Sequence, residues 1–379
     1  MDRLSRLRAY AAQDPGNDRL YFDLVDELLG HGLIEEAQTT LRGMPEASRQ
    51  TQDYLWRNAR CALSSNDFAA AIKLLEALPR EGMDEAAICH DLAYAYLCDG
   101  QIIAAENALA PVLVHAVDVP AVGVLHARVL HHRGQLGDAI TMGEAIVATH
   151  PENAEAWGVL ALLHIDTLQI EPARRAADTA LRLNAHQPDA LTALGTLYLW
   201  SRDADAASQA FGSLLSLQPN AGRALAGAGE SLMLKGDIAD ARALLSRAVV
   251  AMPNHIGTWH ALAWCDLLQG DVAHARICFD KAYELDRNFG ETHGGIGLIH
   301  ALAGETEAAR QAVKRALRLD PQSRNARYAQ SLLWRQEGRR QEAAAMVDGI
   351  LADAGLTTTI RPLDFIDQLH ARMVPGKND

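Results

Sequence analysis

Several features of sheet, membrane and secreted proteins are scarce or missing in this 379-residue sequence. Aromatic residues make up only 5%, and β-branched residues never alternate with polar ones over the length of a strand. No stretch reaches 18 consecutive apolar residues, and Met1 to Asn17 lack the apolar core of a secretory signal. We therefore expect an all-α, soluble and cytoplasmic protein.

Cysteine and positive charge are also limited. The five cysteines, at 61, 89, 98, 265 and 278, are odd in number and show no CxxC spacing, which argues against a disulfide or zinc framework. A net charge of -13 argues against nucleic acid as the main partner. Only five of the 35 basic residues are lysine, which together with abundant alanine suggests a GC-rich bacterial genome.

Motifs of catalysis and cofactor binding are missing as well. The sequence contains no HExxH, no GxSxG, no phosphate loop and no GxGxxG after a strand. The glycine-rich stretch from Gly290 to Gly297 falls inside a predicted helix, where it would reshape packing. His293 and His300 share a helical face but occupy predicted core positions. We expect no enzyme activity, no cofactor and no metal site.

One regularity dominates what is present. Alanine recurs ten times at a fixed interval of 34 residues, without insertion or deletion, and such a period is typical of a solenoid. The ten marker alanines are Ala37, Ala71, Ala105, Ala139, Ala173, Ala207, Ala241, Ala275, Ala309 and Ala343.

A common motif surrounds each marker alanine. One unit shows it most clearly, with Trp259, Leu262, Ala263, Asp266, Gly270, Asp271, Ala275, Phe279 and Ala282 at characteristic spacings. This motif resembles the tetratricopeptide repeat family, whose unit is a helix–turn–helix. The resemblance implies a right-handed α-solenoid of stacked helix pairs that binds other proteins or peptides.

The period also predicts the domain organisation. Residues 1–17 form a half-repeat capping helix, residues 18–357 form ten repeats in one solenoid, and residues 358–379 form a C-terminal helix and tail. This last helix has an apolar edge of Leu363, Ile366, Leu369 and Met373. It either caps the last repeat or is a detachable helix that enters the groove or a partner.

The turn between the two helices of a unit usually has a glycine, as in Gly236 and Gly270, because this position needs a left-handed backbone. Three units have Asn66, Leu168 and Arg202 instead. Leucine and arginine adopt the left-handed region poorly, so we expect turns of a different shape at 168 and 202.

Candidate binding residues follow from the resemblance, since in this family the second, fifth, ninth, twelfth and thirteenth positions of a unit line a concave groove. The early units place a basic and aromatic set there: Trp56, Arg60, His90, Tyr94, Arg128, His131 and His132. The later units place a more apolar set, with Trp200, Met233, His260, Trp264 and Leu268 and neighbours such as Ile165, Leu298 and Leu302.

We interpret these sets as a bipartite groove, in which the basic half meets acidic groups of a client and the apolar half meets a hydrophobic segment. The alternative is that the apolar residues are ordinary core. Two known binding modes of the family are not expected, because no fifth position is lysine, as a carboxylate clamp requires, and the sixth positions lack an asparagine ladder.

The sequence thus predicts a non-catalytic scaffold or adaptor for a protein or peptide client, with a bacterial chaperone or secretion-system helper as the expected role. One alternative is a structural subunit that forms a homo-oligomer through the same surface. Another is a regulatory partner of a separately encoded enzyme.

Overall fold

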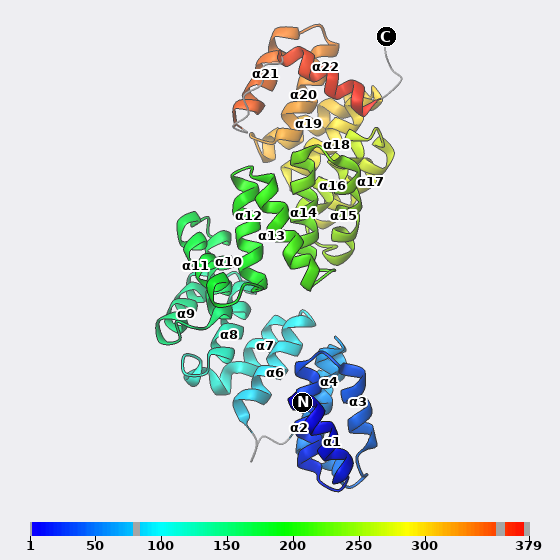
Figure 1. Ribbon diagram of the computed structural model, residues 1–379. Coiled ribbons are helices and arrows are strands. Elements are labelled where there is room, and N and C mark those ends of the chain that lie inside the picture. The colour runs from blue at the N-terminus through cyan, green and yellow to red at the C-terminus, as the bar shows by residue number, and fades with distance from the viewer. Residues whose placement is uncertain (1, 79–83, 354–360, 375–379) are drawn as a thin grey trace. The chain divides into compact units, whose positions relative to one another are not determined.

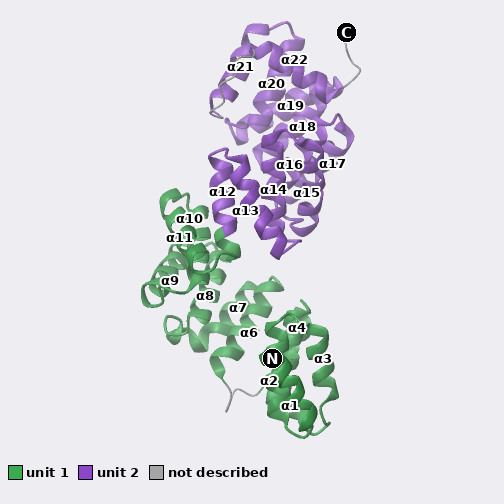
Figure 2. Cartoon of the chain, viewed as in Figure 1, with its two compact units in different colours: residues 1–190 green, residues 191–379 purple. Residues whose placement is uncertain are grey.

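The computed structural model describes residues 2–78, 84–353 and 361–374, and every regular element within them is a helix (Figure 1). The chain divides into two compact units, residues 1–190 and 191–379, with the boundary inside α12 (Pro188–Trp200) (Figure 2). Among the described residues, no helix has both the length and the apolar character needed to cross a membrane. The predicted all-α fold is confirmed.

Unit 1 begins with α1 (Arg3–Gln13), which packs Leu4 and Ala11 into one buried cluster with Phe22 and Val25. Five helix pairs follow, and the short 3-10 helices η1 (Ser48–Gln50) and η2 (Ala110–His115) precede the second and fourth pairs. The pairs are α2 (Asp18–Gly30) with α3 (Ile34–Gly43), α4 (Gln52–Ser64) with α5 (Phe68–Glu76), α6 (Glu85–Cys98) with α7 (Ile102–Leu109), α8 (Pro120–His132) with α9 (Leu136–Thr149), and α10 (Ala154–Asp166) with α11 (Ile170–Leu183).

Unit 2 continues the same alternation and ends with α22 (Pro362–Met373). Its pairs are α12 with α13 (Ala204–Leu217), α14 (Gly222–Lys235) with α15 (Ile238–Ala251), α16 (Ile256–Leu268) with α17 (Val272–Leu285), α18 (Gly290–Ala303) with α19 (Thr306–Leu319), and α20 (Arg324–Gln336) with α21 (Arg340–Asp353). The first helices of the pairs in both units start within one residue of the 34-residue period. One continuous array of ten repeats stays a prediction.

The marker alanines lie where helices touch. All ten have no exposed surface, and neither do Ala59, Ala127 and Ala263 at the eighth position of their units. A methyl group at these positions lets neighbouring helix backbones approach closely, which a longer side chain would prevent. The 34-residue period therefore corresponds to a contact between helices that recurs in every unit.

The turns at Leu168 and Arg202 are not different in shape, so that prediction was wrong. Both residues adopt left-handed backbones, with φ of 56° and 59°, as the turn glycines do. The N–H of Gln169 donates to the carbonyl of His164 at 2.8 Å, the bond with which the glycine turns also close. The hydrogen bonds of the helix pair outweigh a backbone preference worth about 1–2 kcal/mol.

Glycines in unit 2 accommodate buried phenylalanine rings. The ring of Phe211 lies between α12 and α14, where a Cβ atom on Gly195 would come within 2.6 Å of its Cζ and one on Gly227 within 2.3 Å. Phe279 meets Gly295 in the same way, again at 2.3 Å. The glycine-rich stretch of α18 therefore makes room for a ring from the preceding helix pair.

This packing predicts opposite effects for two glycine-to-alanine substitutions in unit 2. Gly227→Ala should lower the free energy of unfolding by about 1–3 kcal/mol, because the new methyl group overpacks the Phe211 ring. The control Gly212→Ala should raise it by up to about 1 kcal/mol, because no atom lies within 4 Å and alanine favours a helix. Urea unfolding followed by circular dichroism measures both, and equal shifts would contradict the packing.

Candidate functional site

In unit 1, four of the predicted residues lie together on α4 and α6. Trp56, Arg60 and His90 line a pocket of about 330 Å³, and the ring of Tyr94 is parallel to that of His90 with centroids 6.5 Å apart. The indole Nε1 of Trp56 donates to a carboxylate oxygen of Asp91 at 3.0 Å. The other oxygen of Asp91 lies 3.2 Å from Nδ1 of His90.

The charge of Arg60 is met by a carboxylate of the preceding helix pair. Arg60 Nη1 lies 2.8 Å from Asp26 Oδ1, while Arg57 Nη2 lies 2.8 Å from Asp26 Oδ2. Arg57 forms a second ion pair with Asp53 at 3.0 Å, and its guanidinium lies over the Phe22 ring, 4.6 Å from the centroid. Two arginines therefore share one aspartate that the sequence analysis did not single out.

Arg128 is likewise paired within the chain. Its Nη2 lies 2.6 Å from Asp189 Oδ2 and 3.3 Å from Glu155 Oε1. Burial opposes its charge, but the two carboxylates outweigh burial and raise the pKa of Arg128. His131 Nε2 lies 2.6 Å from a carboxylate oxygen of Asp166, whereas His132 is exposed. The acidic partners of this basic set belong to the protein itself.

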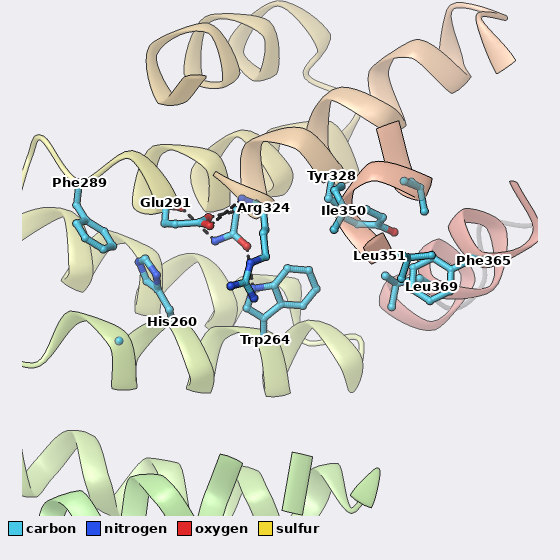
Figure 3. A pocket seen from close by; sticks show the side chains of 13 residues that line it. His260, Trp264, Phe289, Glu291, Arg324, Tyr328, Ile350, Leu351, Phe365 and Leu369 are labelled. Carbon is cyan, nitrogen blue, oxygen red and sulfur yellow. Dashed lines mark hydrogen bonds between the residues drawn. The ribbon is translucent and has the colours of Figure 1, made fainter. Parts of the chain in front are cut away.

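A larger pocket of about 490 Å³ lies in unit 2, lined by residues of α16, α18, α20, α21 and α22 (Figure 3). His260 and Trp264 of the predicted set line it. Its apolar wall includes Trp264, Phe289, Ile350, Leu351, Phe365 and Leu369. A volume of this size, with apolar walls and a few polar groups, is typical of binding sites.

A hydrogen-bond chain holds one side of this pocket. Trp264 Nε1 donates to Asn325 Oδ1 at 2.9 Å, and Asn325 Nδ2 donates to the carbonyl of Glu291 at 3.1 Å. The Glu291 carboxylate accepts from the backbone N–H of Arg324 at 2.7 Å and of Asn325 at 3.0 Å. It therefore satisfies the first turn of α20, where a negative charge is favourable.

The same repeat relation produces one side-chain contact in each unit. Arg128 and Trp264 both occupy the ninth position, and their partners Asp189 and Asn325 both occupy the second position two repeats later. Each pair is separated by 61 residues. The relation carries an ion pair in unit 1 and a neutral hydrogen bond in unit 2.

Tyr328 leaves one polar atom of the unit 2 pocket without a partner. Its side chain is 5% exposed, and no group among the described residues hydrogen-bonds to its hydroxyl. The ring lies 6.2 Å from that of Trp264, and burial raises the pKa of the hydroxyl. A buried hydroxyl with this environment costs free energy until it finds a partner.

The remaining candidates of the apolar set divide between surface and core. Trp200 is 46% exposed, and Met233 is half-buried against the core of unit 2. The backbone carbonyl of Leu268 accepts from Arg372 of α22 at 3.0 Å. The neighbours Ile165, Leu298 and Leu302 are buried and belong to the core, as the packing alternative stated.

One cluster of possible metal ligands occurs in the part of the chain that the structure describes. Asp266, His274 and Cys278 place ligand atoms within 4.8 Å of one another. The buried Asp266 carboxylate already binds Arg242 at 2.5 Å and His274 at 2.6 Å, and burial with Asp266 raises the pKa of Cys278 to about 12. The Asp266 carboxylate is therefore already paired with Arg242 and His274, and the raised pKa of Cys278 favours its protonated thiol.

Several lining residues were not predicted. Glu291 and Asn325 occupy second positions and Tyr328 a fifth position, so the groove rule, applied to the last two units, would have found them. Phe365 and Leu369 lie on α22, outside the period. No signal of the repeat placed them beside Trp264.

His260 predicts a pH dependence of stability. Its ring lies 5.4 Å from that of Phe279, and burial lowers its pKa from 6.5 to about 4. Below pH 6.5 the His260 side chain binds a proton in the unfolded chain but stays neutral in the folded chain. The free energy of unfolding therefore falls as the pH drops toward 4.

We expect this effect to reach about 2 kcal/mol at pH 5. The wild type should therefore lose more unfolding free energy than His260→Gln between pH 8 and pH 5, in urea unfolding at both values. A difference between the two proteins that does not change with pH would show that His260 is not held neutral by burial.

Comparison with known proteins identifies the repeat. Tetratricopeptide repeat models match residues 201–265, 256–289 and 295–355. No curated protein matches the chain.

Similar solved structures include a tetratricopeptide repeat protein from Parabacteroides merdae, with 19% identity, a TM-score of 0.44, and coverage of 66% of this chain and 98% of that one. YrrB, described as a TPR protein with an unusual peptide-binding site, has 21% identity, a TM-score of 0.40, and coverage of 50% and 97%. The Cut9–Hcn1 hetero-tetramer of the APC/C has 14% identity, a TM-score of 0.47, and coverage of 97% and 96%.

The repeat models match helix pairs of unit 2, and the same 34-residue period, marker alanines and turns continue through unit 1. Residues 201–289 and 295–355 of the chain therefore consist of tetratricopeptide repeats.

Proposed function

We propose that this protein is a non-catalytic scaffold that binds a segment of a client protein, and that the unit 2 pocket holds a large apolar side chain of that segment. The observation that carries the proposal is the pocket of about 490 Å³ with Trp264, Phe289 and Phe365 in its wall. Exposed aromatic side chains in a preformed cavity contribute strongly to binding, because they lose little conformational freedom.

The charges favour unit 2 over unit 1 as the main contact. Arg60, Arg128 and His131 already pair with carboxylates of the chain, so a client would have to displace Asp26, Asp189 or Asp166. Displacing a partner from a paired charge costs desolvation energy that the new pair must recover. A client side chain that contacts the apolar wall of the unit 2 pocket displaces no carboxylate from a paired charge, so this cost does not arise there.

The role of a chaperone or secretion-system helper is the narrower form of this proposal. This narrower role depends on which protein the client is. The pocket indicates only the kind of side chain that the client presents. A client segment must carry a bulky apolar side chain, and a polar atom on that side chain can use the Tyr328 hydroxyl.

Affinity capture from a lysate of the source organism tests the proposal. The bait proteins are the tagged wild type, Trp264→Ala, and the control Trp259→Ala, which changes a half-buried tryptophan of the same helix that does not line the pocket. We expect Trp264→Ala to lose at least ten-fold of a captured client by quantitative mass spectrometry, and Trp259→Ala to retain it. Circular dichroism checks that both variants stay helical.

Two results would contradict the proposal. If all three baits capture the same proteins in equal amounts, the pocket does not bind them. If neither these baits nor a variant in which α22 is released from its contacts captures any protein, the protein is not a scaffold for a soluble client.

A further inference from the structure

The C-terminal helix α22 reaches back across two helix pairs of unit 2. It packs on α21 and also on α16. Arg372 Nε donates to the carbonyl of Leu268 at 3.0 Å, at the C-terminal end of α16. Asp367 Oδ1 lies 2.6 Å from Arg335 Nε on α20. α22 therefore touches first helices of two pairs as well as the last second helix.

The apolar edge of α22 faces this surface. Ile366 and Met373 have no exposed area and belong to the core cluster of unit 2, while Leu369 is half-buried against the same cluster. Their spacing of three and four residues puts them on one side of the helix. An amphipathic helix laid into a groove by such a stripe is a common mode of peptide recognition.

The fit between α22 and the groove is incomplete. The unit 2 pocket remains open between Phe365 and Leu369 on one side and Trp264 on the other (Figure 3). The buried Tyr328 hydroxyl beside it has no partner among the described residues. Cores of proteins are close-packed and satisfy their polar groups, so this contact has the properties of an exchangeable interface.

From these contacts we infer that α22 occupies, within its own chain, the surface that binds an amphipathic helix of the client, and that the client replaces α22. The inference rests on the proposed function. The client helix would present apolar residues spaced as Ile366, Leu369 and Met373 are, one of them large enough to enter the pocket. It would also carry an acidic group to meet Arg335 and a basic group for the C-terminal end of α16.

Replacement has a quantitative consequence. α22 belongs to the same chain as the groove, so it competes with a client as an intramolecular ligand. A client therefore binds with an apparent affinity that is lower than its affinity for the open surface. Any change that releases α22 raises client binding without altering the pocket.

The test releases α22 by exchanging two surface charges in the full-length chain. Asp367→Arg/Arg372→Glu repels Arg335 and the C-terminal end of α16, and it leaves the net charge and the buried edge unchanged. The matched control, Arg276→Asp/Asp280→Arg, exchanges an exposed ion pair on α17. The probe is a fluorescein-labelled synthetic peptide of residues 361–374, and fluorescence anisotropy measures its binding.

We expect the peptide to bind the released variant at least ten-fold more tightly than it binds the wild type or the control. Adding Trp264→Ala to the released variant should remove most of that gain. Hydrogen exchange should show that amides of residues 362–373 lose protection in the released variant only. The released variant should also capture more of the Trp264-dependent client.

Three results would overturn the inference: equal peptide affinity for all chains, release of α22 without a gain in peptide binding, and α22 amides that stay protected after the charge exchange. The peptide assay needs no client, so it separates this inference from the proposed function. Peptide exchange without client capture by the wild type or the released variant would contradict the scaffold alone. Client capture without peptide exchange would contradict only the role of α22.

Discussion

The close approach of neighbouring helices at small residues is the constraint on which the structure depends. Each helix pair is too thin to bury its own apolar face, so it is stable only against its neighbours. The fully buried marker alanines and the glycines against Phe211 and Phe279 bring the backbones together. This spacing is what puts the ninth position of one pair within hydrogen-bonding distance of the second position two pairs later, as Trp264 and Asn325 show.

The two units use this common geometry differently. In unit 1, Arg60 and Arg128 meet Asp26 and Asp189, so the groove positions stabilise the protein itself. In unit 2, the corresponding positions form an apolar cavity whose polar rim is fixed by Glu291. The framework is therefore shared, whereas the pocket walled by Trp264, Phe289 and Phe365 belongs to the second unit.

The sequence predicts the helix pairs and their packing well, because the positions that repeat every 34 residues are also the positions that are buried. The buried marker alanines and the helix starts both follow from a 34-residue register, whereas the contacts of Arg128 and Trp264 within the chain were not predicted. Local preference was a poorer guide at Leu168, where the helix pair imposed a left-handed turn. The apolar edge of α22 predicted a helix that caps the last repeat or enters the groove, but it did not predict that this helix reaches α16, because the contact of Arg372 with Leu268 joins residues 104 apart and lies outside the repeat.

The reach of α22 also limits how this gene can vary in length. Gain or loss of whole repeats is the easiest change for an array, since every helix stays in phase. An added repeat between α16 and α20 would move the end of α16 one helix pair away from Arg372, while Arg335 and Asp367 stayed together. Repeats upstream of α16 face no such constraint from α22, so variation in repeat number among related chains should be confined to that side.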